Sequence, residues 1–312
     1  MLAVWSHWSK PFAARPGGGW PTVAHYLMSC ALSLETARTH FGGTRLVTDT
    51  VGKQMLIDGA GLTFDDVRLD LAEIEEYDPG WWILGKVQAF RTQDEPFVHI
   101  DNDVFLWSGL PHRLTSADVL AQNPEHFTDD SDYYKLAELE AIRCYPYGWL
   151  PKEVEWCRSL YGVHQQSLNT GIYGGNRVDF IQYCAELVFE MLDHPGNRDA
   201  VAKIDNKIKV AGLLEMFLPA ACIEYHTVRH HSPFRNVRAA TLFASAEEAY
   251  RDGEAGSYTH LIGLSKSRPA YARKLEARMR SRYPRCYERC MEYSRFVETS
   301  LDAAAGPASP PP

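Results

Sequence analysis

The most informative stretch of the sequence is Phe97-Val98-His99-Ile100-Asp101-Asn102-Asp103-Val104-Phe105. An apolar strand delivers two carboxylates, two residues apart, at its C-terminal end. In an extended chain, residues i and i+2 point to the same side, so both carboxylates can reach one cation. Ligands of open α/β sheets collect at this edge, and oxygen ligands suit Mg²⁺ or Mn²⁺, which share their coordination with substrate phosphates. We therefore expect a metal site here. The alternative is that the pair only ends a strand and caps the next turn.

Strand-like and helix-like stretches alternate upstream of this pair. We predict strands at 2–8, 45–48, 67–71 and 96–100 and helices at 20–40, 52–61 and 78–93. The strands are apolar throughout, which is typical of parallel strands covered on both faces. The expected fold class is α/β, with a mixed, mostly parallel sheet flanked by helices.

The pattern is less regular downstream of the pair. We interpret about 107–165 as an insertion that holds two helices, at about 132–142 and 152–160. Further on we predict strands at 167–173 and 221–226, helices at 178–192 and 199–217, a loop at 257–267 and a helix from 271 to about 299. The expected division is a main domain over 1–267, a basic C-terminal helix over 268–303 and a disordered tail over 304–312.

Composition excludes several classes of protein. Of 312 residues, 45% are hydrophobic and 23% charged, as in ordinary globular proteins and unlike disordered, collagen-like or coiled-coil chains. The apolar stretches are too short to span a bilayer, and the N-terminus does not resemble a secretory signal. The seven cysteines are scattered, so we expect reduced thiols in a cytoplasmic protein. A net charge of −8 argues against a nucleic-acid binder.

The charge is unevenly distributed. Residues 268–295 hold nine Lys or Arg and three Glu, a net charge of +6, which leaves −14 for the rest of the chain. A basic amphipathic helix can lie on anionic lipid, so a peripheral membrane contact is one interpretation. The interpretation we favour is a solvated helix that packs on the acidic body through its apolar residues, Leu275, Met279, Tyr283 and Tyr287.

Two further motifs follow the carboxylates. In Ser167-Leu168-Asn169-Thr170-Gly171-Ile172-Tyr173-Gly174-Gly175-Asn176, an Asn amide can both donate to and accept from sugar hydroxyls, and Gly lets a ligand approach the backbone closely. The alternative is an ordinary Asn-Gly turn. In His260-Leu261-Ile262-Gly263-Leu264-Ser265-Lys266, an imidazole suits Mn²⁺ and a Lys supplies a point charge for phosphates. The alternative is a surface loop.

In this order, the three motifs resemble those of the GT-A fold glycosyltransferases. In that family the Asp-x-Asp pair follows three or four strands and chelates the metal on a sugar nucleotide, and the Asn-Thr/Ser-Gly segment lines the donor sugar. The last motif resembles the His-x-x-Gly-x-x-Lys of retaining, family 8-like enzymes of the glycogenin and galactosyltransferase type. There the His is the third metal ligand, and the Gly and Lys contact the diphosphate. The usual Pro-Trp after the Lys is absent, and Ser267-Arg268-Pro269 follows instead.

Other stretches, including 8–12 and 121–125, are similar to an uncharacterised bacterial family of glycosyltransferase-like proteins. The resemblance implies metal-dependent transfer of a sugar from a nucleotide-diphosphate donor, a UDP-sugar being favoured. Transfer with retention is favoured, and the acceptor is left open among a glycan, a lipid-linked molecule, a peptide and a small molecule. The implied cofactor is Mn²⁺ or Mg²⁺.

The resemblance implies roles for the motif residues, the ends of the first two strands suggest roles for His7, Trp8 and Asp49, and the apolar surroundings of Glu215 suggest a role for its carboxylate. The metal ligands would be Asp101, Asp103 and His260. Catalytic roles are expected for Asp103, Asn169 and Glu215, although Glu215 could instead pair with a buried Lys or Arg. Donor contacts are expected for His7, Trp8, Asp49, Lys86, Asp101, Asn102, Asn169, Gly171, Gly263 and Lys266.

Three other functions stay open. Haloacid-dehalogenase-like phosphatases use a similar carboxylate pair, with the first Asp as nucleophile, but they place it on the first strand and not the fourth. A nucleotidyltransferase would need a Gly- and Arg-rich loop directly after the first strand, whereas Gly17-Gly18-Gly19 comes later. The last alternative is an inactive nucleotide-sugar-fold module that binds partners through its basic helix.

Overall fold

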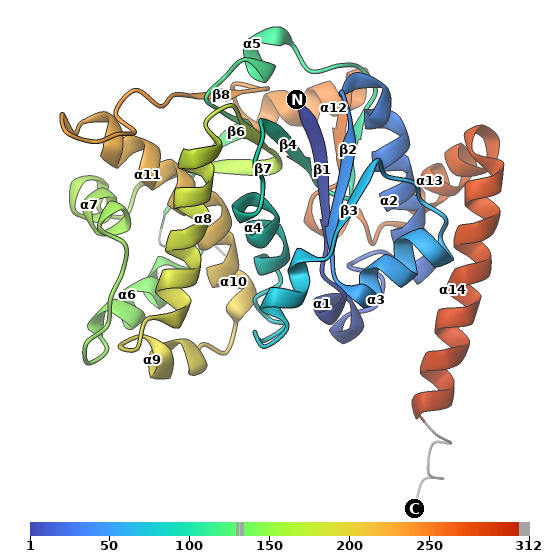
Figure 1. The fold of residues 1–312 in the computed structure, drawn as a ribbon, viewed down its shortest axis with the longest axis horizontal. Helices are drawn as coiled ribbons and strands as arrows, with labels where there is room; N and C mark the ends of the chain where they lie inside the picture. Colours follow the sequence, from blue (N-terminus) through green and yellow to red (C-terminus); the bar gives the residue numbers. More distant parts are fainter. Residues whose placement is uncertain (129–130, 132–133, 306–312) are drawn as a thin grey trace, which may run out of the picture.

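The computed structural model describes residues 1–128, 131 and 134–305 (Figure 1). Within these residues, seven strands form one sheet in the order β3-β2-β1-β4-β7-β6-β8. Their bounds are β1 (Leu2–His7), β2 (Thr44–Thr48), β3 (Asp66–Arg68), β4 (Phe97–Ile100), β6 (Val119–Phe127), β7 (Gln165–Gly175) and β8 (Ala239–Thr241). Strand β7 is antiparallel to both neighbours, and the other neighbouring pairs are parallel. The predicted mixed, mostly parallel sheet is confirmed.

Helices cover both faces of this sheet (Figure 1). One face packs against α4 (Leu84–Arg91), α8 (Val178–Asp193), η4 (Leu213–Phe217) and α11 (Leu218–Thr227). The other face packs against α2 (Val23–Ala37), α13 (Pro269–Arg282) and α14 (Pro284–Ala305). Strands β2 and β4 are buried on both faces because this double cover leaves neither side to solvent.

Shorter elements complete the described chain. They are α1 (Ser9–Ala14), η1 (Arg38–His40), α3 (Thr50–Lys53), η2 (Gln54–Gly59), η3 (Asp70–Ile74), α5 (His112–Thr115), α6 (Leu136–Cys144), α7 (Lys152–Tyr161), α9 (Arg198–Ala202), α10 (Lys207–Gly212), α12 (Ala246–Ala255) and η5 (Gly263–Ser265). Two short strands, β5 (Val104–Leu106) and β9 (Tyr258–His260), pair with each other in a separate antiparallel sheet. Because Val104 pairs with His260, this small sheet brings the C-terminal motif to the carboxylates at the end of β4.

Three predicted elements are wrong. The strand expected at 221–226 is helix α11, which continues the helical turns of η4 and packs its apolar side on β7 and α7. The helix expected at 199–217 is broken between α9 and α10. The long helix expected at 271–299 is two helices, because Pro284 cannot continue α13 and instead begins α14.

Two strands, β6 and β9, lie where the sequence analysis predicts loops. Residues 119–127, expected to be loop within the insertion, form β6 of the main sheet. The second half of β6 is polar and contains Pro124, so its sequence pattern does not predict a strand. Strand β8 pairs only with residues 119–121, so Pro124 lies where β6 has an unpaired edge, and a proline is tolerated there. The loop expected at 257–267 contains β9 and η5. The division of the chain into domains stays a prediction, and residues 306–312 of the expected tail lie outside the described residues.

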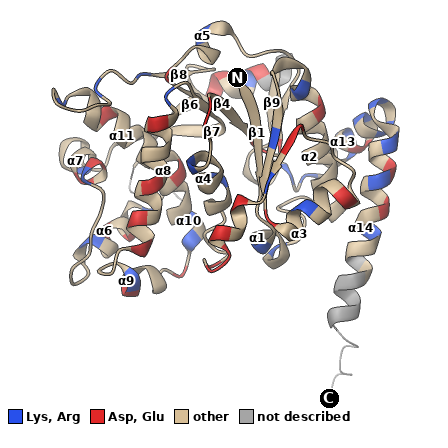
Figure 2. Ribbon diagram, viewed as in Figure 1, with Lys and Arg blue, Asp and Glu red and all other residues tan. Residues whose placement is uncertain are grey.

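The C-terminal helices pack on the body as favoured above. Leu275 and Met279 are buried in the core beside α2, and Tyr283 and Tyr287 pack partly against it. Lys and Arg residues recur along α13 and the first half of α14 (Figure 2). No helix in the described part of the chain is long and apolar enough to cross a membrane. All seven cysteines are free thiols.

Candidate metal and ligand site

Three predicted ligands meet at the carboxyl edge of the sheet. Asp101 and Asp103 follow β4, and His260 ends β9. One ligand atom from each lies within 4.8 Å of the others. His260 Nε2 is 3.6 Å from Asp103 Oδ1 and 3.9 Å from Asp101 Oδ2. The structure therefore brings together two carboxylates and an imidazole that could hold a metal ion.

The hydrogen bonds around Gln122 fix which nitrogen of His260 faces the carboxylates. Gln122 Nε2 donates to Asn123 Oδ1 at 3.0 Å, so Gln122 Oε1 is the acceptor end of the amide. That oxygen accepts from the Tyr258 hydroxyl at 2.6 Å and lies 2.7 Å from His260 Nδ1. Nδ1 must therefore carry the proton, which leaves the lone pair of Nε2 directed at the carboxylates.

Burial and charge set the protonation of the cluster. Burial lowers the pKa of His260 to about 4, so the imidazole is neutral at pH 7. Burial raises the pKa of Asp103, but the Lys266 ammonium and His260 outweigh this effect and hold that pKa below its usual value. Burial raises the pKa of Asp101 to about 7, opposed by Lys86. At neutral pH the site thus holds at least one carboxylate and a neutral imidazole.

This donor set fits a divalent cation. The neutral His260 Nε2 and the two carboxyl groups converge on one point, and their negative charge is balanced by Lys86 beside Asp101 and Lys266 beside Asp103. Two hard oxygens and one imidazole are suitable ligands for Mn²⁺, and for Mg²⁺ with water and phosphate completing the coordination. The residues present therefore fit the metal that the motifs imply.

Lys266 lies at the same cluster. Its ammonium Nζ is 2.5 Å from Asp103 Oδ2. The triple-glycine loop lies close by, since a Cβ on Gly19 would meet the Lys266 Cδ at 3.9 Å. Gly263, three residues before Lys266, has a positive φ of 56° and open space where a side chain would be. A ligand approaching this loop would meet a cation and uncovered backbone.

A second lysine is buried behind the cluster. Lys86 Nζ, on α4, is 2.7 Å from Asp101 Oδ1, 2.6 Å from Glu215 Oε1 and 2.7 Å from the Thr170 carbonyl oxygen. Glu215 is only 4% exposed and also accepts from the Thr170 hydroxyl. The structure thus places Glu215 in a buried ion pair with Lys86, and not beside open space.

Strand β7 carries the second motif along the site. A Cβ on Gly171 would overlap with Gln122 Oε1 and His260 Nδ1, so only glycine fits there. The Gly171 amide donates to Asn169 Oδ1 at 3.0 Å. Asn169 Nδ2 in turn donates to Glu125 Oε1 at 2.7 Å. Asn169 is therefore oriented from both sides.

The predicted donor contacts of the first two strands are placed differently. Trp8 is buried in the core beside Gly85 of α4. Asp49 accepts from the Gly52 and Ser9 amides, both at 2.7 Å, so its carboxylate caps α3. His7 Nδ1 pairs with the Tyr26 hydroxyl at 2.6 Å.

Asn102 sits in the turn between the two carboxylates. Asn102 Nδ2 donates to the Ser6 carbonyl oxygen at 3.0 Å, and the Asn102 carbonyl oxygen accepts from the Ser29 hydroxyl at 2.7 Å. These contacts tie the turn to β1 and α2.

Sequence reasoning missed three residues that shape the site: Gln122, Glu125 and Tyr258. Gln122 and Glu125 lie in the stretch 121–125, whose resemblance to a bacterial family was the available signal. Tyr258 lies two residues before His260, so in an extended strand it points to the same side. These signals identify site residues only once β6 and β9 are known to be strands beside the metal cluster, and the sequence analysis predicts neither strand.

The chain is similar to one family of proteins and, at low identity, to a solved structure. Residues 1–293 match the model of a protein family described as a family of unknown function, DUF6734. No curated protein matches the chain. A similar solved structure is the crystal structure of the galactosyltransferase LgtC in complex with donor and acceptor sugar analogues. The two chains share 13% identity over 94% of this chain and 95% of that chain, with a TM-score of 0.40.

Proposed function

Because the chain belongs to DUF6734, a family of unknown function, we propose its function from the site itself: metal-dependent transfer of a sugar from a nucleotide-diphosphate donor. The observation that carries the proposal is the convergence of Asp101, Asp103 and the bare Nε2 of His260, with Lys266 beside them. The order of the three motifs, which resembles that of GT-A glycosyltransferases, supports the same function. The class of donor we favour is a UDP-sugar, and transfer with retention.

The reaction balances without an added oxidant or reductant. The acceptor hydroxyl oxygen forms a bond to the anomeric carbon of the donor sugar. The bond from that carbon to the diphosphate oxygen breaks, its electron pair leaves with the nucleoside diphosphate, and the hydroxyl proton is released. A bound Mn²⁺ or Mg²⁺ supplies Lewis-acid stabilisation of the departing phosphate oxygens.

The chain's own residues would bind and orient the donor. Asp101, Asp103 and His260 would hold the metal, and Gln122 keeps His260 in the required tautomer. Lys266 would exchange its contact with Asp103 for a contact with the diphosphate, adding positive charge where negative charge develops. Asn169 and Gly171 would hold the donor sugar, with Asn169 fixed by Glu125.

Two carboxylates are assigned positioning roles. Glu215 would fix Lys86, which in turn holds Asp101 Oδ1, so Glu215 acts through other residues and not as a base. Asp49 would support the nucleotide side of the site by capping α3. The contacts expected from His7, Trp8, Asn102 and Gly263 to the donor stay proposals.

A donor-hydrolysis assay tests the function. Purified full-length protein is incubated with Mn²⁺ and UDP-, GDP- or TDP-sugars, and release of the free sugar is followed. We expect hydrolysis of one nucleotide class, its loss in EDTA, and at least a 100-fold loss in Asp103→Asn. Calorimetric titration with Mn²⁺ should show weakened metal binding in the same variant.

The matched control is Asp58→Asn, which removes an exposed carboxylate outside the cluster. Hydrolysis that persists in EDTA or in Asp103→Asn would refute the proposal. Release of phosphate from p-nitrophenyl phosphate, with Asp101 phosphorylated, would identify a metal-dependent phosphatase instead. Failure of every nucleotide to bind at millimolar concentration with Mn²⁺ present would favour an inactive module.

A further inference from the structure

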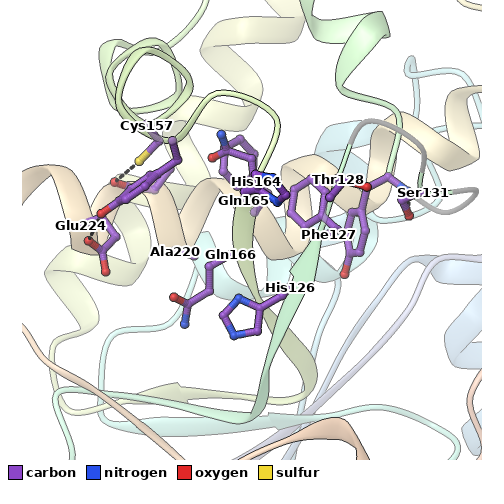
Figure 3. Close-up of a pocket in the computed structure, with 14 residues that line it drawn as sticks. His126, Phe127, Thr128, Ser131, Cys157, His164, Gln165, Gln166, Ala220 and Glu224 are labelled. Atoms are coloured by element: carbon purple, nitrogen blue, oxygen red, sulfur yellow. Dashed lines mark hydrogen bonds between the residues drawn. The ribbon is translucent and has the colours of Figure 1, made fainter.

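A cavity of about 660 Å³ lies at the Phe127–Gln165 end of the β6–β7 strand pair (Figure 3). Its floor is apolar and buried, formed by Phe127, Phe217, Ala220 and Ala221. Its rim is polar and includes the exposed His126, His164 and Gln166. This size and this arrangement are typical of small-molecule sites.

One buried group in the cavity wall is unsatisfied. Gln165 is 3% exposed, and its Nε2 donates to the Gly162 carbonyl oxygen at 2.6 Å. Its Oε1 is buried and has no hydrogen-bond partner among residues 1–128, 131 and 134–305. Buried acceptors are rarely left unpaired, so a ligand hydroxyl or amine that donates here would complete the side chain's bonding.

The charge of the cavity excludes one class of ligand. Among the described lining residues, Glu224 is the one acidic side chain and there is no Lys or Arg. Glu224 Oε2 accepts from the Tyr161 hydroxyl at 3.2 Å. A phosphate or carboxylate entering here would meet a like charge at Glu224 and, within the described lining, no Lys or Arg to balance it. The metal cluster with Lys266 suits phosphates, so the two places differ in the charge of the ligand they favour.

A chain of hydrogen bonds runs from the cavity wall to the metal cluster. The Tyr134 hydroxyl, in the cavity wall, donates to Glu125 Oε2 at 2.6 Å. Glu125 Oε1 accepts from Asn169, which accepts from the Gly171 amide, and the Gly171 carbonyl accepts from the Asp101 amide at 2.9 Å. Asn169 and Gln165 are four strand residues apart, about 13 Å at the rise of an extended chain. A ligand that reaches from the cavity floor to Asn169 must therefore contain more than one ring.

We propose that this cavity binds the acceptor of the transferase, and that the acceptor is a neutral, hydroxyl-rich, extended molecule, a glycoside or oligosaccharide. Its anchored ring fills the apolar floor and donates a hydroxyl to Gln165 Oε1. Its reacting hydroxyl lies toward Asn169, where the oxygen–carbon bond forms as described above. The role of acceptor rests on the proposed function, whereas the binding of a neutral glycoside does not.

Ligand-observed NMR on the full-length protein tests the proposal with two matched probes. They are p-nitrophenyl β-glucoside, which is neutral, and p-nitrophenyl β-glucuronide, which differs by one carboxylate. We expect the glucoside to bind at least tenfold more tightly than the glucuronide. Ala220→Trp fills the floor and should abolish glucoside binding, whereas Ala277→Trp, on the exposed side of α13, should not.

A charge reversal at the rim gives a second variant that leaves the core intact. Glu224 is half-buried, and Glu224→Lys should raise the affinity for the glucuronide to that for the glucoside or above it. Donor hydrolysis should be unchanged in the control variant Ala277→Trp, which lies outside the cavity and the metal cluster. Equal binding of both probes to the wild type, or undiminished binding to Ala220→Trp, would overturn the proposal. Probe binding without donor hydrolysis overturns the acceptor role and the proposed function together, and hydrolysis without probe binding overturns the cavity's role alone.

Discussion

Lys86 is the residue whose removal should destabilise the fold most directly. Burial lowers its pKa, but Asp101 and Glu215 outweigh this effect and raise that pKa, so the ammonium stays charged at neutral pH. Lys86→Met would leave the buried Glu215 without a counter-ion, which costs about 3–5 kcal/mol of unfolding free energy. Urea unfolding at pH 7 measures the change.

The double variant Lys86→Met/Glu215→Gln is the matched control for this prediction. It removes both charges, so it should recover more than half of the lost stability. Equal loss in the single and the double variant would show that the ion pair does not explain the effect, and that the Lys86 hydrogen bond to the Thr170 carbonyl oxygen matters more.

Because His7 is buried, we expect the folded state to lose stability in acid. Burial lowers its pKa from 6.5 to about 4, opposed by Asp49, so between these values the unfolded chain binds a proton that the folded chain does not. The contribution of His7 to stability is therefore present above pH 6.5 and is lost as the pH falls toward 4, by about 2 kcal/mol at pH 5. The difference between the free energies of urea unfolding at pH 7 and at pH 5 should be smaller by this amount in His7→Asn than in the wild type. The exposed His40→Asn should behave like the wild type, and an unchanged pH difference in His7→Asn would contradict the assignment.

At the residue scale, the sequence could predict ligands but not their partners. Asp101 and Asp103 are two residues apart, so their shared direction follows from strand geometry alone. His260 was found through a motif, because nothing local connects it with a strand more than 150 residues earlier. The pairing of Lys86 with Glu215, and the role of Gln122, depend on how four separate elements pack, and no spacing in the sequence encodes that.

Among the elements, β7 should be the one least tolerant of added volume at the site. Gly171→Ala would place a methyl group against Gln122 and His260, so the pair must separate. We expect at least a tenfold loss of Mn²⁺ affinity by calorimetry, together with a lower urea midpoint. Gly42→Ala, at an exposed position where a Cβ meets only the Met1 carbonyl oxygen at 4.0 Å, is the control. Wild-type metal affinity in Gly171→Ala would show that His260 is not held by this contact.

Elements were predictable where burial gives a simple pattern. Strands β1, β2 and β4 are covered on both faces, so their continuous apolar runs identified them. Strand β6 turns polar where it passes the site and the cavity, and Pro124 added a false loop signal. Helix α11 packs against both β7 and α7, and its apolar residues are not confined to one stripe, so its periodicity could not separate helix from strand.

For the whole molecule, the uneven charge has a structural basis. The +6 segment forms α13 and the first half of α14, and its apolar side chains are already buried against the −14 body. Several of its arginines are used locally, Arg278 over the Trp107 ring and Arg289 on the Asp58 carbonyl oxygen. Other basic side chains, including Arg273, Arg282 and Arg285, are exposed. An anionic surface could therefore attract these helices and would meet the 65% exposed Phe296 of α14, while Leu275 and Met279 are buried against the body.

This arrangement predicts electrostatic and reversible binding to anionic vesicles. Full-length protein should co-sediment at low salt with vesicles containing 30% phosphatidylserine, because each exposed cation contributes about 1 kcal/mol of binding free energy. It should dissociate from them at 0.5 M NaCl, where the Debye length is only about 3–4 Å. It should not bind neutral phosphatidylcholine vesicles. A truncation before Arg268 would expose the core that Leu275 and Met279 cover, so the better variant is Arg273→Glu/Arg282→Glu/Arg285→Glu. This charge-reversed protein should lose vesicle binding and keep its urea midpoint. Salt-resistant binding, or binding to neutral vesicles, would mean that apolar side chains of α14 insert, and that the helix leaves the body when it meets a membrane.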